Sequence, residues 1–179
     1  TDGPYSYNRG KDAGDFNEDG CMDFLANGYS GANVYMYEGN CNGTFEDEVV
    51  VGLTGSSYTN SYSLTVGDYN NDGHIDYLTS SYSNGNVDFY AGLGNGTFIL
   101  TLDPSFDFTN SRYKPADSWD YNYDGYMDYI FMTYSYETLY YYKGMGGGTF
   151  SFDSVTYTGG ASVMGVSAPH PSYEFYINK

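Results

Sequence analysis

Three nine-residue stretches of this chain carry oxygen side chains at a spacing that suits a bound cation. Each has Asp at its first, fifth and ninth positions, Asn at its third and Gly at its sixth. The stretches contain Asp15, Asn17, Asp19 and Asp23; Asp68, Asn70, Asp72 and Asp76; and Asp120, Asn122, Asp124 and Asp128. Side chains two residues apart converge on one centre where the backbone curls tightly, and the glycine permits that curl. The pattern predicts a hard divalent ion in each loop.

The flanking residues predict strands around these loops. An EF-hand, whose first half has a similar pattern, needs a Glu at its twelfth position and a helix on each side, and both features are missing. The residues after each loop alternate in polarity or are rich in aromatics, as strands are. Gly, Tyr, Ser and Thr crowd every candidate helical window. We therefore expect loops set between β-strands.

A tandem repeat runs through the chain. The first Asp of each loop lies at residue 15, 68 or 120, and an Asn-Gly-Thr-Phe or Gly-Gly-Thr-Phe motif ends 30 residues later each time. For the second unit the pattern predicts strands at 62–67, 75–82, 86–90 and 97–102. The fold class that follows is all-β, with tandem four-stranded antiparallel propeller-type blades in one domain, 1–179. We expect three full repeats, at about 5–55, 56–107 and 108–157, and an incomplete terminal unit at 158–179.

These motifs resemble the FG-GAP or VCBS repeats of integrin α-chain propellers, fungal lectins and many secreted bacterial proteins. The resemblance covers nearly all of the chain. It implies that each loop binds calcium, three ions in all, through its Asp and Asn side chains. It also implies that the seventh loop residue contributes its backbone carbonyl, which assigns that role to Cys21, His74 and Tyr126. Three units are fewer than the four to eight blades that typically close a propeller ring.

The composition excludes several classes of partner. Six Lys and Arg against 23 Asp and Glu give a net charge of −17, which repels nucleic acid and anionic membrane surfaces. No apolar run approaches the roughly 18 residues that span a bilayer, so we expect no membrane insertion. The chain does not begin with Met, and we expect Thr1 to be a processed mature end.

The two cysteines predict a disulfide. Cys21 and Cys41 flank a predicted hairpin and lie almost opposite each other in antiparallel register. A bridge indicates a secreted, extracellular setting, and two free buried thiols are the alternative. Asn42 and Asn95 begin Asn-Gly-Thr sequons, so both are candidate glycosylation sites. The family's turns favour Asn-Gly-Thr for backbone reasons, which leaves unmodified asparagines as the alternative.

Catalytic residues are not indicated. His74 lies in a loop, His170 lies between two prolines, and no Ser–His or Cys–His pair is suggested, so we expect no enzyme. Two functions remain, and the first is a calcium-stabilised structural subunit that assembles head-to-tail with other copies of itself. The alternative is a lectin-like module that uses some of its 24 tyrosines to bind glycans. For assembly, we expect the last strand to pair with a second copy, with Tyr173, Phe175 and Ile177 setting its register.

Overall fold

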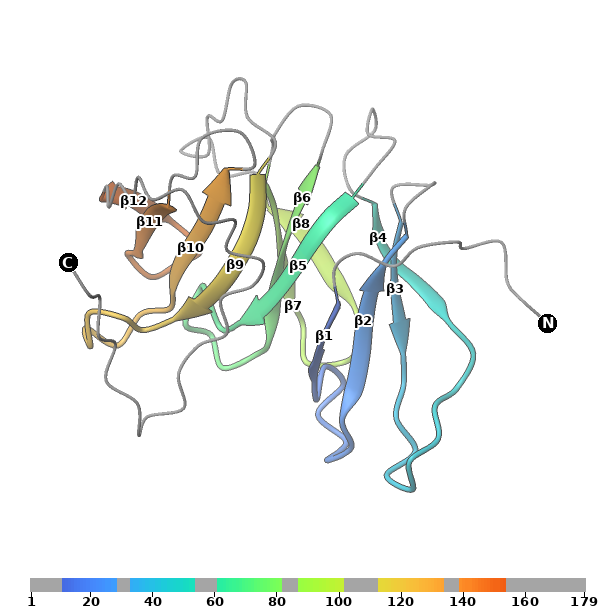
Figure 1. Cartoon of the computed structure of the whole chain (residues 1–179). Helices are drawn as coiled ribbons and strands as arrows, with labels where there is room; N and C mark the ends of the chain where they lie inside the picture. The colour runs from blue at the N-terminus through green and yellow to red at the C-terminus, as the bar shows by residue number, and fades with distance from the viewer. Residues whose placement is uncertain are drawn as a thin grey trace.

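The described residues form three four-stranded antiparallel sheets, as predicted (Figure 1). This computed structural model describes residues 11–28, 33–53, 61–81, 87–101, 113–133 and 139–153. Blade one contains β1 (Lys11–Gly14), β2 (Asp23–Asn27), β3 (Asn33–Tyr37) and β4 (Val49–Leu53). Blade two contains β5 (Ser61–Gly67), β6 (Asp76–Ser81), β7 (Val87–Gly92) and β8 (Phe98–Thr101). Blade three contains β9 (Tyr113–Trp119), β10 (Asp128–Thr133), β11 (Leu139–Gly144) and β12 (Phe150–Asp153).

Within each blade the strands pair in sequence order, because each is joined to the next by a short reversal of the chain. The strands of blade two begin and end within two residues of the predicted bounds. The predicted terminal unit at 158–179, with its assembly strand, lies outside the described residues. Within the residues that the structure describes, no helix is long and apolar enough to cross a membrane.

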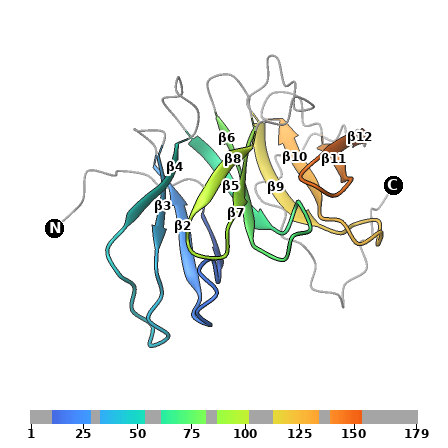
Figure 2. The ribbon, with the colours of Figure 1, turned by 180° about the vertical axis from the view of Figure 1, so that it is seen from behind.

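The blades stand side by side (Figure 2). β1 packs next to β5, and β5 next to β9. The apolar core lies between blades, because each sheet buries both of its faces only when a neighbour covers them. One cluster joins blades one and two: Phe16, Leu25, Val34, Met36, Leu64, Tyr77 and Tyr90. A second joins blades two and three: Tyr69, Leu78, Val87, Phe89, Tyr129, Tyr142 and Phe150. Five tyrosines therefore serve as core residues in these two clusters.

Hydrogen bonds repeat from one blade junction to the next. The Gly96 amide, in the last turn of blade two, donates to the Phe16 carbonyl of blade one over 2.9 Å. The Gly148 amide of blade three donates in the same way to the Tyr69 carbonyl of blade two over 3.2 Å. Each of these carbonyls belongs to the second residue of an oxygen-rich loop. The loops are therefore part of the contact between blades.

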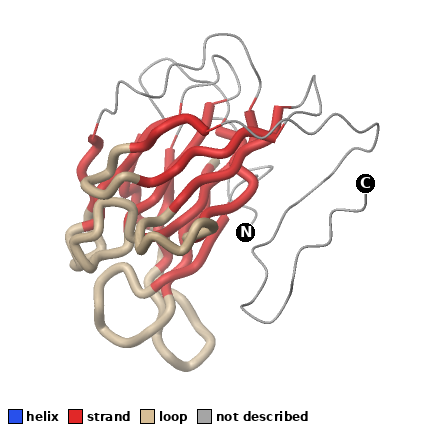
Figure 3. Tube along the Cα trace, turned by 90° about the vertical axis from the view of Figure 1, so that its left-hand side faces the viewer, coloured by secondary structure: helices blue, strands red, loops and turns tan. Residues whose placement is uncertain are grey.

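All three loops leave the first strand of a blade and enter its second strand. Loop 1 comprises residues 15–23, loop 2 residues 68–76 and loop 3 residues 120–128. Figure 3 shows the described loops gathered at one end of the sheets. The β-hairpin order of each blade thus places the three candidate sites on a single end of the molecule.

Candidate functional site

The three loops share one backbone conformation. The fourth residue of each adopts a left-handed conformation, with φ of 59° at Glu18, 64° at Asn71 and 62° at Tyr123. The sixth residue is the glycine, with φ of 89°, 93° and 92° at Gly20, Gly73 and Gly125. A Cβ on any of these glycines would meet nothing within 4 Å, so the glycine is needed for its backbone angle rather than for space.

Side chains inside each loop hold this curl in place. In loop 2, Asp68 accepts from the amides of Asp72 (3.0 Å) and Gly73 (2.9 Å), and Asn70 Oδ1 accepts from the Asp72 amide. Asp72 in turn accepts from the His74 amide over 2.9 Å. The corresponding bonds recur in loop 1 and loop 3. The oxygen atoms at positions one, three and five are therefore fixed by their own loop.

The ninth residue anchors each loop to the sheet. Asp76 is buried, and its carboxylate accepts from the amides of Tyr69 (2.8 Å), Asn70 (3.2 Å) and Gly92 (2.8 Å). Burial raises the pKa of Asp76 to about 6. Asp23 and Asp128 are equally buried and make the corresponding contacts. Each carboxylate thus ties the second residue of its loop to a glycine that lies sixteen positions after the aspartate.

The loops differ in the side chains around them. Asn17 Nδ2 of loop 1 donates to Glu38 Oε1 over 2.9 Å, whereas Lys143, at the corresponding position of blade three, lies 3.4 Å from Asp124 of loop 3. Loops 1 and 2 are linked by Glu18 and His74, whose Oε1 and Nδ1 atoms lie 2.5 Å apart. The side-chain hydrogen bond to Glu18 raises the pKa of His74.

Loop 3 has a further partner that the sequence analysis did not single out. The Tyr141 hydroxyl of β11 donates to Asp128 over 2.6 Å and accepts from Asn122 Nδ2 over 3.2 Å. Burial, followed by the hydrogen bond to Asp128, raises the pKa of Tyr141. Alignment of the three units shows that blades one and two have Met36 and Phe89 at this position. In the sequence, this contact is signalled by a tyrosine at a position where the other two units have an apolar side chain.

The donor set of each loop fits a hard divalent ion. Carboxylate, carboxamide and carbonyl oxygens are the ligands that calcium prefers, and a carboxylate oxygen that accepts one amide bond keeps further acceptor capacity. In the part of the chain that the structure describes, no three His, Cys, Asp or Glu side chains form a group that could hold a metal. The loop carboxylates bond to backbone amides instead. A calcium site in a loop would use the Asn side chain and a backbone carbonyl as ligands in addition to the carboxylates.

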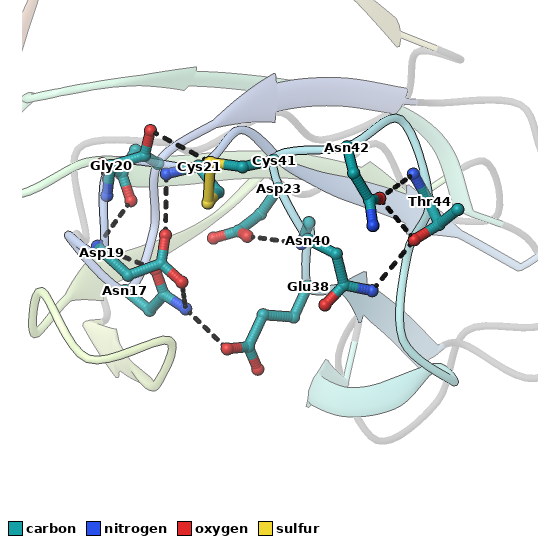
Figure 4. Close-up of a disulfide and its surroundings, with 12 residues drawn as sticks. Asn17, Asp19, Gly20, Cys21, Asp23, Glu38, Asn40, Cys41, Asn42 and Thr44 are labelled. Atoms are coloured by element: carbon teal, nitrogen blue, oxygen red, sulfur yellow. Dashed lines mark hydrogen bonds between the residues drawn. A yellow bond between two sulfur atoms is a disulfide. The ribbon is translucent and has the colours of Figure 1, made fainter.

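The predicted disulfide between Cys21 and Cys41 is confirmed (Figure 4). Their Cα atoms lie 4.9 Å apart, and the bridge joins loop 1 to the turn between β3 and β4. Asn42 and Asn95, the two sequon residues, are exposed in equivalent turns. The Oδ1 atom of each accepts from the amide of the threonine two residues on. A structural use of both asparagines is therefore clear, and glycosylation stays a prediction.

Breaking the disulfide should lower the free energy of unfolding by about 3 kcal/mol, since it closes a 20-residue separation. The double variant Cys21→Ser, Cys41→Ser should show this loss in urea unfolding without a reductant. Chemical reduction of the unmodified chain should produce a loss of the same size and should not affect the double variant. Equal stability of the unmodified chain and the variant would contradict the prediction.

Comparison with known proteins agrees with this geometry. The model of the FG-GAP-like repeat matches residues 15–79 and 68–131, which together exceed half of the chain. The chain belongs to the FG-GAP-like repeat family. Each match begins at the first Asp of a loop and extends into the second strand of the next blade, so this FG-GAP-like protein is matched across its blade junctions.

Among solved structures, the FG-GAP-like chain is similar to a lectin from Agrocybe aegerita, described as specifically recognising non-reducing terminal N-acetylglucosamine. The TM-score is 0.56 at 20% sequence identity, and the match covers 82% of this chain. It covers 37% of the lectin chain, so the likeness concerns the fold of about a third of that protein. No match was found among curated proteins.

Proposed function

We propose that this FG-GAP-like protein is an extracellular, calcium-stabilised module that binds glycans and has no catalytic role. The observation that carries the proposal is a group of exposed aromatic rings at loop 3. Tyr123 is 87% exposed, Trp119 41% and Tyr126 37%. Flat aromatic rings stack on the apolar faces of sugars. Polar groups belong to the same loop or contact it, since Asn122 is a loop residue and Lys143 pairs with Asp124.

Two further findings support this proposal. The fold is shared with a lectin, although a shared fold alone does not assign a ligand. Disulfides form and persist in oxidising environments such as the extracellular space, where glycans are also found. A glycan array probed with the folded protein in calcium should give saturable binding, with terminal N-acetylglucosamine among the sugars to examine first. The heat-unfolded chain is the control, and the absence of binding to every glycan would refute the proposal.

Calcium, in this proposal, occupies all three loops and stabilises the blades. Each loop offers three aspartates, an asparagine and the carbonyl of Cys21, His74 or Tyr126. Repulsion between these carboxylates is relieved when a divalent ion binds. The bound ion supplies charge neutralisation, and the protein residues hold the loop in the binding conformation before the ion arrives.

Calcium should therefore raise the melting temperature, and Asp72→Ala should remove about a third of that increase. With a dissociation constant on the order of 10⁻⁴ M, 10 mM calcium would stabilise each loop by about 2.7 kcal/mol. Asp47 is exposed and outside every loop, so Asp47→Ala is the matched control and should keep the whole increase. Calorimetric melting with and without excess chelator tests this, and identical melting curves in both buffers would exclude the calcium sites.

Head-to-tail self-assembly is the second candidate function, because no described blade packs on the face of blade one that carries Met22 and the Gly43 turn. Met22 is 60% exposed, whereas the corresponding Ile75 and Met127 pack against the core. The Gly43 turn corresponds to the turns that reach the preceding blade through Gly96 and Gly148, and a Cβ on Gly43 would meet nothing within 4 Å. Light scattering in calcium tests this candidate. A monomer at working concentration would exclude self-assembly and leave glycan binding as the remaining function.

A further inference from the structure

Three equivalent positions, at and just after the end of each first strand, show how a blade packs against the next one. Strand register and loop position identify these positions in all three blades. They are Asp12, Gly14 and Phe16 in blade one; Thr65, Gly67 and Tyr69 in blade two; and Asp117, Trp119 and Tyr121 in blade three. We call the last three residues the Trp119 face.

The side chain at the first position of blade one, and those at the first and third positions of blade two, bond to the following blade. Asp12 accepts from the Val66 amide of blade two over 3.2 Å. Thr65 Oγ1 and the Tyr69 hydroxyl each lie 2.8 Å from Ser118 Oγ of blade three. The polar groups at these two positions are therefore used where one blade meets the next.

The middle position is glycine wherever another blade follows. A Cβ on Gly14 would lie 3.0 Å from Ile75 Cδ1, and a Cβ on Gly67 would lie 2.8 Å from Met127 Cε. A side chain end can shift to admit a methyl group, but an indole is far larger than such a shift provides. Blade three has Trp119 here, and its side chain is 41% exposed. A further blade cannot dock on blade three in the geometry of the other two junctions.

The two polar groups of the Trp119 face have no hydrogen-bond partner in the described chain. Asp117 Oδ2 and the Tyr121 hydroxyl are both buried and unpaired. Burial raises the pKa of both groups, and the charge of Asp117 adds to the increase at Tyr121. Asp117 and Trp119 are two residues apart on β9 and point to the same side of the strand. Buried polar groups without partners are costly, so a ligand that bonds to both groups would remove that cost.

We propose that the Trp119 face binds one pyranose ring of a neutral or amino sugar. The indole stacks on the apolar face of the ring, a sugar hydroxyl donates to Asp117 Oδ2, and the Tyr121 hydroxyl bonds to a sugar oxygen. This site rests on the proposed glycan function and specifies where and which sugars bind. Acidic sugars are disfavoured because Asp117 and a net charge of −17 repel them.

Loop 3 holds part of this site in place. Tyr121 is the second residue of the loop, and its amide donates to Asp128 over 2.9 Å. Its ring packs edge-on against Tyr141, with the ring centroids 6.3 Å apart, and Tyr141 itself bonds to Asp128. The orientation of the Tyr121 ring is therefore fixed by the same carboxylate that anchors the loop.

The single tryptophan of the chain makes the site directly observable. Titration with glucose, galactose, mannose, N-acetylglucosamine and glucosamine should change Trp119 emission saturably for at least one sugar. Glucuronic acid should have no effect. An emission unchanged by every sugar, including those bound on the array, would overturn the site.

Variants separate the site from the function. By calorimetry, Trp119→Ala should weaken binding at least about tenfold, whereas Trp119→Tyr, which keeps a ring, should stay within about threefold. Asp117→Asn keeps one acceptor oxygen and should weaken binding about fivefold. Phe45→Ala removes a distant exposed aromatic of blade one and should bind normally. Melting curves check that each variant is folded.

The outcomes are distinct. If the unmodified chain binds glycans and Trp119→Ala binds equally well, the Trp119 face is refuted and the glycan function stands. If the unmodified chain binds no glycan, both proposals fail. If light scattering shows a dimer that Trp119→Ala abolishes, a second copy occupies the face, and the sugar site is wrong.

Discussion

Replacing Asp76 by alanine is expected to lower the free energy of unfolding by about 4 kcal/mol, even in excess chelator. The buried carboxylate accepts three amide hydrogen bonds, which join both ends of loop 2 to the strand glycine Gly92. Alanine leaves these donors without an acceptor, and each buried unpaired donor costs about 1–3 kcal/mol. In chelator the loss involves no calcium, because the three hydrogen bonds lie within the protein. Urea unfolding monitored by circular dichroism measures it.

Two further substitutions serve as controls for Asp76→Ala. Asp47→Ala should change the free energy of unfolding by no more than about 0.5 kcal/mol, since Asp47 is exposed and outside the loops. Asp72→Ala should have a small effect in chelator and a larger one in calcium, because its carboxylate is exposed and is a proposed ligand. An Asp76→Ala variant as stable as Asp47→Ala in chelator would show that the anchoring bonds do not hold the loop.

The Gly92→Ala variant is expected to be among the most damaging of the single glycine substitutions. A Cβ at Gly92 would overlap the carbonyl oxygen of Ile75, which is a backbone atom and cannot rotate away. The same overlap is found between Gly39 and Met22 and between Gly144 and Met127. The end of loop 2 would have to move away from β7, which would also break the Gly92 bond to Asp76. We expect a loss of about 4 kcal/mol or more, a large part of the stability of an ordinary domain.

Gly73→Ala is the control within the same blade. Gly73 has open space around its Cβ but a φ of 93°, so alanine there brings backbone strain without overlap. We expect a loss of about 1–2 kcal/mol for this variant. Thermal and urea unfolding of the two variants separate the two causes. A Gly92→Ala variant no less stable than Gly73→Ala would mean that the strands accommodate the added methyl group.

Much of this protein could be predicted from the sequence because its loops are local structures. Each loop closes within nine residues through bonds to its own amides, so the spacing of Asp, Asn and Gly is enough to identify it. The repeat of that spacing predicted three blades and their strand order. The disulfide was also predictable, because its cysteines flank one hairpin, whose register sets the distance between them. The calcium ligands remain predictions.

Tertiary structure alone decided how the blades meet and what is left at the end of the array. Tyr69 and Ser118 are 49 residues apart, and the sequence does not show that their hydroxyls bond. Nor does it show that Gly67 faces Met127, which is what makes Trp119 at the equivalent position of blade three an exception. These contacts form only after sheets are complete and pack face to face. Their energy depends on which side chains the register turns toward the neighbouring blade, and spacing along the chain does not encode that choice.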